Sequence, residues 1–314
     1  MSYPYLGDLV NQIFGVSWNI PIPMFGLFVA IALVVFIYVA EKEVARIEKL
    51  GLVSGAKFYS KNDDQCIIVP AHEIVAGLVL LSTISGIIGA RIFHILEYAG
   101  EFLNDPASMI FTRSGFSIYG GVTFSMITGI IYLKKRGVPV MPMLDALAPS
   151  MILSYGIGRI GCQVSGDGDW GVAADMALKP GWLPDWFWAQ SYENNIAGVV
   201  IQHPGVYPTP IYEAGAALVI FAFLWAVRKV PNNPGYLFSL YLLFSGFERL
   251  LIEKIRTNSE YHLGGFIFTQ AELISTIIIF AGLVGVIKTS NSKYLLRISY
   301  FLVVIGALSA CTIL

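Results

Sequence analysis

An arginine set among glycines is the clearest residue pattern in this chain that could do chemistry. Arg159 lies in the segment Gly158-Arg-Ile-Gly161, and the same predicted loop continues through Ser165 and Asp167 to Gly171. A guanidinium is planar and permanently charged, and it binds two phosphate oxygens at once. The segment directly follows an apolar stretch long enough to cross a membrane. The pattern predicts a site for a lipid phosphate at the membrane edge.

A second arginine pattern lies about ninety residues later in the chain. Arg249, Glu253 and Arg256 are spaced i, i+4 and i+7, which places them on one face of a helix. Glu253 can pair with either arginine, and two arginines with one carboxylate leave a net positive charge. That charge suits a phosphodiester. The alternative is a structural ion-pair network at a helix end.

A third set combines a cation with aromatic rings. Arg91, His94 and Tyr98 are spaced i, i+3 and i+7 and share a helical face, and the small residues of Gly86-Ile-Ile-Gly-Ala90 let a neighbouring helix approach closely. The set is either part of a lipid site or an interfacial group in which Arg91 and His94 extend toward water.

Two further segments begin predicted spans with tyrosines. Tyr119 precedes the paired glycines Gly120 and Gly121, which permit an unusual backbone and the close approach of a ligand. Tyr212 and Glu213 follow a proline-rich start that suits an early helical position. By itself the first segment is more typical of packing and an interfacial aromatic belt than of a ligand site, and the second is a weak signal.

The composition indicates the element type that must position these residues. The 314-residue chain is 56% hydrophobic and 13% charged, with a mean hydropathy of +0.68. A soluble protein would carry roughly 25% charged residues, so we predict an all-α polytopic membrane protein with a single membrane domain over residues 1–314. The net charge of −1 and the lack of a basic patch argue against a nucleic-acid partner. The three cysteines, Cys66, Cys162 and Cys311, are too far apart to indicate a disulfide framework.

Apolar runs predict seven to eight transmembrane helices. The expected spans are 22–40, 72–98, 117–133, 141–157, 209–229, 235–256, 269–288 and 296–314, of which the last is an additional C-terminal hydrophobic helix. Residues 158–208, rich in Gly, Pro, Trp and Asp, are too irregular to cross lipid and are expected to form an external, periplasmic cap. Within the cap, Asp167 and Asp169 could suggest a cation site, but an Asp-Gly-Asp sequence is more typical of a turn. We therefore predict no metal.

The distribution of lysine and arginine predicts the orientation. Alternate connections between the spans hold 13 of the 20 basic residues, which places these connections in the cytoplasm and the N-terminus outside. Seven basic residues fall instead in outward-going or outward-facing segments, and ionisable groups in such positions usually mark a function. They are Arg91, Arg113, Arg159, Lys179, Arg249, Lys254 and Arg256. The sequence thus predicts a cationic site toward the outer leaflet.

These motifs together resemble the bacterial prolipoprotein diacylglyceryl transferase family. The segment 158–171 resembles its glycine–arginine signature, and 119–121 stands where that family has His-Gly-Gly. The segment 207–213 is similar to its His-Pro-x-Gln-x-Tyr-Glu element, and 249–256 to its Arg-x-x-x-Glu-x-x-Arg element. The start of the span at 269–275 resembles the last common helix of the family. The matches occur in order along the chain.

The resemblance implies a multi-pass enzyme of the bacterial cytoplasmic (inner) membrane. Such an enzyme transfers the sn-1,2-diacylglyceryl group of phosphatidylglycerol to the lipobox cysteine of a prolipoprotein, releases glycerol 1-phosphate, and uses no cofactor. Its partners are therefore that lipid, lipobox peptides and the bilayer. Charge developing on the departing phosphate would be stabilised by Arg159 with Arg249 and Arg256. The lipid would also contact the other motif residues, namely Arg91, His94, Gly120, Gly121, Gly158, Gly161, Ser165, Asp167, Gly171, Tyr212 and Glu213.

Several positions depart from the family pattern. Tyr119 and Tyr207 replace histidines, Cys162 and Ser165 replace asparagines, and the stretch before Gly171 is one residue longer. An ordinary tyrosine has a pKa of about 10 and is a poor base at neutral pH. The base that activates the thiol is therefore expected to be either Tyr119 beside a guanidinium, or His94 or His203 brought close by the fold.

Two other functions fit the same arginines. A lipid or anion transporter would hold its substrate near the midplane, but such proteins typically show internal repeats, and the sequence contains none. A catalytically altered paralogue would bind lipid or lipoprotein precursors without transferring the lipid. Such a binding protein would tolerate loss of Arg159, whereas the enzyme would not.

Overall fold

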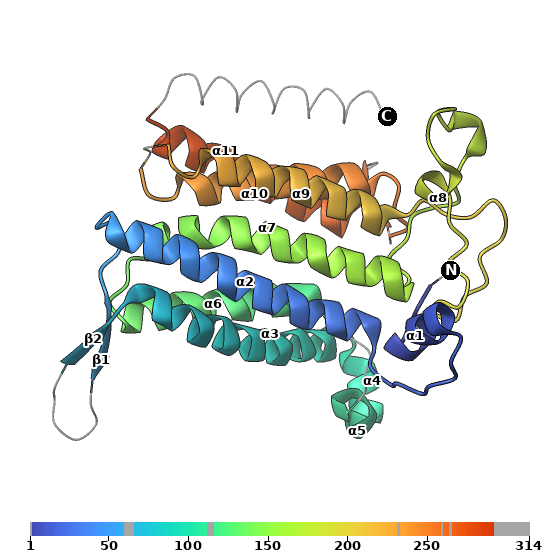
Figure 1. The fold of residues 1–314 in the computed structure, drawn as a ribbon, viewed down its shortest axis with the longest axis horizontal. Coiled ribbons are helices and arrows are strands. Elements are labelled where there is room, and N and C mark those ends of the chain that lie inside the picture. Colours follow the sequence, from blue (N-terminus) through green and yellow to red (C-terminus); the bar gives the residue numbers. More distant parts are fainter. Residues whose placement is uncertain are drawn as a thin grey trace. The chain divides into compact units, whose positions relative to one another are not determined.

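The computed structural model describes residues 2–59, 66–111, 116–230, 233–258, 260–263 and 266–291. The described chain falls into two compact units, one from Met1–Phe36 with Leu147–Leu314 and one from Ile37–Ala146. The fold is mostly helical (Figure 1).

Seven long helices of the described chain lie at the predicted spans. They are α2 (Met24–Lys49), α3 (Val75–Glu97), α6 (Ile118–Lys135), α7 (Val140–Ser165), α9 (Thr209–Val227), α10 (Tyr236–Glu253) and α11 (Gln270–Thr289). Shorter helices are α1 (Leu6–Phe14), η1 (Ala71–Ile74), α4 (Ala99–Asn104), α5 (Pro106–Phe111), η2 (Met176–Leu178) and α8 (Asp185–Trp188). The predicted helix at 296–314 lies outside the described residues.

Five helical segments of the described chain are long and apolar enough to cross a membrane, judged by length and composition alone. They are Met24–Lys49, Ala71–Glu97, Val140–Ser165, Thr209–Val227 and Gln270–Thr289. The chain is therefore a multi-pass membrane protein. In contrast, α10 carries three charged residues, Glu248, Arg249 and Glu253, within its 18 residues.

Two β-hairpins depart from the predicted all-α fold. Strands β1 (Ala56–Tyr59) and β2 (Cys66–Val69) pair antiparallel, as do β3 (Glu260–Leu263) and β4 (Phe266–Thr269). Each strand has only four residues, which is too short for the two-residue alternation of a strand to be recognised with certainty in the sequence.

Helix α7 extends eight residues beyond its predicted end, so Arg159 lies on a helix and not in a loop. Glycines at 158 and 161 lower the helical propensity of this stretch, but packing decides its conformation. A Cβ atom on Gly161 would lie 2.7 Å from Cβ of Phe28, so only glycine allows this contact with α2. The helix ends where Gly166, at φ +62°, donates its N–H to the carbonyl of Cys162 at 3.0 Å.

In the first unit, α9, α10 and α11 lie side by side, and small residues bring their backbones together (Figure 1). A Cβ atom on Gly282 would lie 2.6 Å from the backbone nitrogen of Leu243, and one on Gly246 would lie 2.7 Å from a side-chain carbon of Ile279. Buried apolar side chains from α7, α9, α10 and α11 fill the interior, namely Ile152, Ala217, Leu224, Leu237, Leu240 and Val286.

In the second unit, α3 packs along α6 through the small residues that the sequence singled out. A Cβ atom on Gly120 would lie 2.2 Å from the carbonyl oxygen of Gly89, and one on Gly86 would meet the hydroxyl of Ser125 at 2.3 Å. The prediction that residues 86–90 permit a close helix neighbour is confirmed.

Residues 166–208 of the first unit are largely irregular and contain only η2 and α8. Backbone bridges join Val206 to both Ala173 and Gln190. The N-terminal segment is bound to the same region, because Ser2 donates its N–H to the carbonyl of Glu193 at 2.6 Å and Tyr3 donates to that of Val164 at 2.7 Å. The irregular segment predicted from residue 158 thus begins only after α7 ends.

Candidate functional site

Arg159 lies in the last turns of α7 with only 11% of its side chain exposed. Its Nη1 donates to Oδ2 of Asp169 at 2.5 Å, and its Nη2 donates to Oε2 of Glu213. Asp169 belongs to the segment after α7, and Glu213 lies in the first turns of α9. One guanidinium therefore joins three parts of the first unit.

Arg256 meets the same two carboxylates from the other side. Its Nη2 donates to Oδ1 of Asp169 at 2.8 Å, and its Nη1 lies 3.7 Å from Oε1 of Glu213. We call Arg159, Arg256, Asp169 and Glu213 the arginine–carboxylate cluster. Two guanidiniums face two carboxylates, so the formal charges of the cluster balance.

Asp169 and Arg256, which lie beyond the ends of α7 and α10, each have a pKa shifted by the opposite charges of the cluster. Burial alone would raise the pKa of Asp169, but the guanidiniums of Arg159 and Arg256 hold that pKa below its usual range. Burial would likewise lower the pKa of Arg256, yet the nearby carboxylate of Asp169 raises it above the ordinary value. The ionised forms therefore stabilise one another.

The backbone fixes the position of two cluster members. Gly171 forms an isolated antiparallel bridge with Arg256, and Val172 donates its N–H to the carbonyl of Ile255 at 2.8 Å. A Cβ atom on Gly171 would lie 2.4 Å from the carbonyl oxygen of Ile255, which explains the glycine. The Thr209 hydroxyl donates to the carbonyl of Asp169 at 2.7 Å.

The predicted arginine pattern on α10 is wrong in one respect. The helix ends at Glu253, so Arg256 leaves the shared face and pairs with Asp169 and Glu213 instead. Among the described residues, Glu253 forms its ion pair with Arg249, at 2.8 Å, and not with Arg256. The expected excess of positive charge is absent from these pairs of the described chain, because each arginine has a carboxylate partner.

Three buried guanidinium N–H groups have no hydrogen-bond partner within the described ranges. They belong to Nε of Arg159, Nε of Arg256 and Nη1 of Arg249. A buried donor that lacks an acceptor is costly, and an anion is the acceptor that a guanidinium prefers.

A tyrosine links the cluster to a third carboxyl group. The hydroxyl oxygen of Tyr155, one turn before Arg159 on α7, lies 3.3 Å from Oε1 of Glu213 and 3.3 Å from Oε1 of Glu248. Both glutamates are buried, with 1% and 7% of their surfaces exposed. Neither Tyr155 nor Glu248 belongs to the motifs that the sequence singles out, although a charged residue within an apolar helix is a recognised signal of function.

The other predicted residues of the first unit have varied surroundings. A Cβ on Gly158 would meet nothing within 4 Å in the described structure. Ser165 is buried and donates its hydroxyl to the carbonyl of Cys162 at 3.3 Å. Asp167 accepts the N–H of Asp169 at 3.2 Å, and the Tyr212 hydroxyl donates to the carbonyl of Phe187 at 2.6 Å.

Five predicted site residues belong to the second unit: Arg91, His94, Tyr119, Gly120 and Gly121. Arg91 donates Nη1 to a backbone carbonyl of α5 at 3.1 Å, and the ring of His94 lies 4.9 Å from that of Tyr98. Tyr119, Gly120 and Gly121 form the first turn of α6, and Gly120 packs on α3.

One group of the described residues could bring together metal ligands. Single ligand atoms of Cys162, Asp167 and Asp169 lie within 4.8 Å of one another. Both Asp169 oxygens, however, already accept hydrogen bonds from guanidiniums. We assign no metal to this group, since a cation there would compete with two fixed positive charges.

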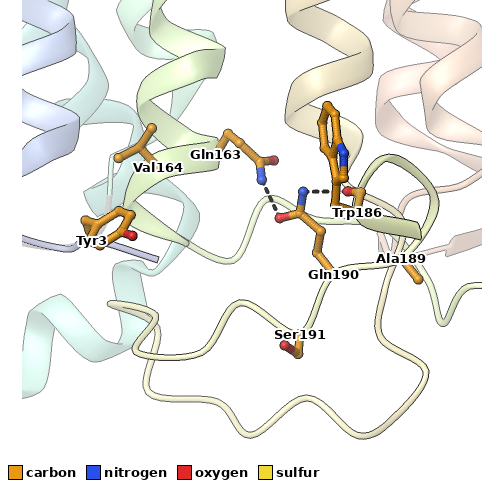
Figure 2. A pocket seen from close by; sticks show the side chains of 7 residues that line it. All are labelled: Tyr3, Gln163, Val164, Trp186, Ala189, Gln190 and Ser191. Atoms are coloured by element: carbon orange, nitrogen blue, oxygen red, sulfur yellow. Dashed lines mark hydrogen bonds between the residues drawn. The ribbon is translucent and has the colours of Figure 1, made fainter. Parts of the chain in front are cut away.

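A pocket of about 420 Å³ lies at the end of α7, one turn beyond Arg159 (Figure 2). Gln163 donates its amide to that of Gln190 at 2.6 Å, and Gln190 donates in turn to the carbonyl of Trp186 at 2.7 Å. The lining combines amides with aromatic side chains, and is formed by Tyr3, Gln163, Val164, Trp186, Ala189, Gln190 and Ser191.

Comparison with known proteins decides the family. Residues 12–288 match the family model of prolipoprotein diacylglyceryl transferase. The chain belongs to the prolipoprotein diacylglyceryl transferase family. It is 27% identical over 278 residues to phosphatidylglycerol–prolipoprotein diacylglyceryl transferase of Oceanobacillus iheyensis, covering 86% of each chain. It is 25% identical over 337 residues to the protein of that name from Leptospira interrogans, covering 91% of this chain and 94% of the relative. A Bacillus cereus protein of the same name is 32% identical over 203 residues, covering 64% of this chain and 72% of the relative.

The resemblance seen in the sequence is thereby confirmed, and the family motifs have a structural explanation in this chain. The glycine–arginine motif and the start of α9 supply Arg159 and Glu213, while the segment after α10 supplies Arg256. Tyr207, which stands at a family histidine, accepts the N–H of Asp175 with its hydroxyl at 3.1 Å and packs on the ring of Trp188. It therefore helps to organise the segment between α7 and α9.

Proposed function

We propose that this protein transfers the sn-1,2-diacylglyceryl group of phosphatidylglycerol to the lipobox cysteine of a prolipoprotein and releases glycerol 1-phosphate. It is a transferase of lipoprotein maturation, as its family indicates. The thiol sulfur attacks the lipid glycerol carbon that carries the phosphate. The carbon–oxygen bond breaks, and its electron pair leaves with the phosphate.

The observation that carries the proposal is the convergence of Arg159 and Arg256. Their guanidiniums approach the same two carboxylates, and each keeps a buried Nε–H without a partner in the described structure. Two such groups are suited to a phosphodiester, and they can stabilise the charge that develops as the ester bond breaks. We assign Arg249 and Glu253 to the support of this site.

The lipid phosphate takes the place of the Asp169 carboxylate. Asp169 is 37% exposed at its side chain, whereas Glu213 is 2% exposed and held on a helix. Asp169 is therefore the carboxylate that can leave, and a phosphodiester anion carries the same charge. In the absence of lipid, Asp169 keeps the two guanidiniums neutralised and in position.

The polypeptide substrate fits the pocket at the end of α7. A lipobox must present its cysteine close to Arg159, and the pocket is lined by Gln163, which follows Arg159 by four residues on α7. The amides of Gln163 and Gln190 can hydrogen-bond an extended peptide backbone.

The predicted topology would allow both substrates to reach the site from the outer side of the membrane. We propose seven to eight membrane spans in one membrane domain, an outside N-terminus, and a site toward the outer leaflet covered by the external segment 166–208. The basic residues on alternate connections support this orientation.

The residues of the second unit are assigned through the family motifs. Tyr119 stands where the family has histidine, and we assign it to the handling of the thiol proton. Arg91, His94, Gly120 and Gly121 are assigned to lipid binding. In the first unit, Gly158, Gly161, Ser165, Asp167, Gly171 and Tyr212 shape the site around Arg159.

A reconstituted assay tests the function. The purified protein is incubated with phosphatidylglycerol vesicles and a lipobox peptide, beside the variants Arg159→Ala and Tyr119→Phe. We expect a thioether-linked diacylglyceryl peptide from the unmodified protein and none from Arg159→Ala. A folded protein that gives no such product would overturn the proposal. Product from Tyr119→Phe at the unmodified rate would remove Tyr119 from proton handling.

A further inference from the structure

A chain of three oxygen atoms connects the arginine–carboxylate cluster to the interior of the first unit. Oε1 of Glu213, the hydroxyl of Tyr155 and Oε1 of Glu248 follow one another at 3.3 Å and 3.3 Å. They come from α9, α7 and α10 respectively. Neither Tyr155 nor Glu248 has a place in the motifs that identify the family.

The number of protons shared by these three oxygen atoms is limited. A phenol has one O–H, so Tyr155 can donate to one carboxyl group at a time. If both glutamates were ionised, one of the two contacts would bring lone pairs together without a hydrogen, in a buried place where that is costly. The chain is complete when one glutamate carries a proton, because that glutamate then donates to Tyr155.

The proton belongs to Glu248 in the resting protein. Glu213 contacts two guanidiniums, which stabilise its charge. Glu248 is buried, and the described residues offer it no ion pair. Arg159, Arg256, Arg249 and Tyr241 are the other ionisable groups whose fields reach the Glu213–Tyr155–Glu248 chain.

The transfer reaction creates a negative charge beside Glu213. The phosphodiester of the lipid carries one charge, and the departing glycerol 1-phosphate carries a second when the carbon–oxygen bond breaks. That second charge develops on a group held by Arg159, which Glu213 also contacts. An ionised Glu213 would oppose it.

We propose that Glu248 and Tyr155 are positioning residues that transfer a proton to Glu213 as the phosphate leaves. The O–H bond of Glu248 breaks as its proton passes to Tyr155, and the proton of Tyr155 passes to Glu213, so the tyrosine stays neutral. The negative charge moves from Glu213 to Glu248, away from the leaving group, and the proton returns when glycerol 1-phosphate departs. The thiol proton goes to the base and is not part of this chain.

The inference rests on the proposed diacylglyceryl transfer, and the predicted effect is on turnover. Glu248→Gln keeps a hydrogen-bonding side chain without an acidic proton, and Tyr155→Phe removes the connecting hydroxyl. Each is expected to lower kcat about 10- to 100-fold, because a charge close to the leaving group is no longer moved away. The KM for phosphatidylglycerol should stay within about twofold, since the charge that meets the bound lipid is unchanged.

The test measures kcat and KM for the protein in phosphatidylglycerol vesicles with a lipobox peptide. Tyr236→Phe is the matched control, since it removes a hydroxyl from another buried tyrosine of the first unit. The double variant Tyr155→Phe/Glu248→Gln should be no slower than the slower single variant, because either change interrupts the same chain.

The outcomes separate the two proposals. Full kcat in both single variants, with Arg159→Ala inactive, would overturn the proton transfer and leave the enzyme assignment standing. Equal losses in Tyr155→Phe and Tyr236→Phe, or multiplied losses in the double variant, would also overturn it, because they indicate packing. An inactive unmodified protein would contradict the transferase itself.

Discussion

Removal of the Arg159 guanidinium should damage both stability and turnover, and the two effects can be separated. Arg159→Ala leaves the 2% exposed carboxylate of Glu213 with Arg256, at 3.7 Å, as its remaining ion-pair partner in the described chain. The double variant Arg159→Ala/Glu213→Gln removes the stranded charge as well. We expect the double variant to recover stability and to remain inactive.

The magnitudes follow from burial and from the number of hydrogen bonds lost. Loss of one partner of a buried ion pair costs about 3–5 kcal/mol, so Arg159→Ala should unfold at a clearly lower temperature. Removal of a donor that stabilises a developing oxyanion costs roughly 10²- to 10³-fold in turnover. Because a guanidinium supplies two donors to one phosphate, we expect a loss of at least about 10³-fold in kcat/KM, which corresponds to about 4 kcal/mol.

Thermal unfolding in detergent and the thioether-forming assay measure the two quantities on the same samples. Arg136→Ala is the control, since it removes an arginine whose guanidinium stacks on Phe58 at 3.6 Å in the second unit. It should keep full activity. Recovery of activity together with stability in Arg159→Ala/Glu213→Gln would refute the reasoning, because Arg159 would then act only as the counter-charge of Glu213.

Three other predictions concern the surroundings of Arg159. The folded-state pKa of Asp169 lies below its unfolded value of about 3.9, so the stability that its ionised form contributes is present above that pH and is lost as the pH falls through the folded-state pKa. Asp169→Asn should therefore flatten the fall of the melting temperature at acid pH. An unchanged fall at acid pH would count against the ion pairs of Asp169. Gly171→Ala places a Cβ 2.4 Å from the carbonyl of Ile255 and should destabilise by about 1–3 kcal/mol in thermal unfolding, whereas Gly158→Ala, with open space around it, should not; equal effects would contradict the described packing. Gln190→Ala should raise the KM for a lipobox peptide several-fold without changing the KM for phosphatidylglycerol. A shift in the KM for the lipid instead would contradict the assignment of the pocket to the peptide.

The sequence predicted the long helices well because apolar runs of membrane length leave few alternatives. It placed Arg159 in a loop because glycines weaken a helix, and the contact of Gly161 with Phe28 that stabilises the helix is a tertiary feature. It kept Arg256 on a helical face because nothing in the local pattern marks the helix end at Glu253.

The partners of the arginines were harder to predict than the arginines themselves. Asp169 was read as part of a turn, and its pairing with Arg159 and Arg256 depends on Gly166 and Gly168, which adopt φ values of +62° and +99°. Such conformations are permitted by glycine but not dictated by it. The contacts that decide the charge of the site therefore depend on the three-dimensional course of one short segment.

The anchored backbone around Asp169 determines how the site can respond to lipid. The Thr209 hydroxyl holds the carbonyl of Asp169, and the bridge between Gly171 and Arg256 fixes the chain two residues later. In the proposed exchange of this carboxylate for a lipid phosphate, the Asp169 side chain therefore leaves its two guanidiniums while the backbone stays in place. Headgroup binding then requires no rearrangement of the segment that carries Asp169.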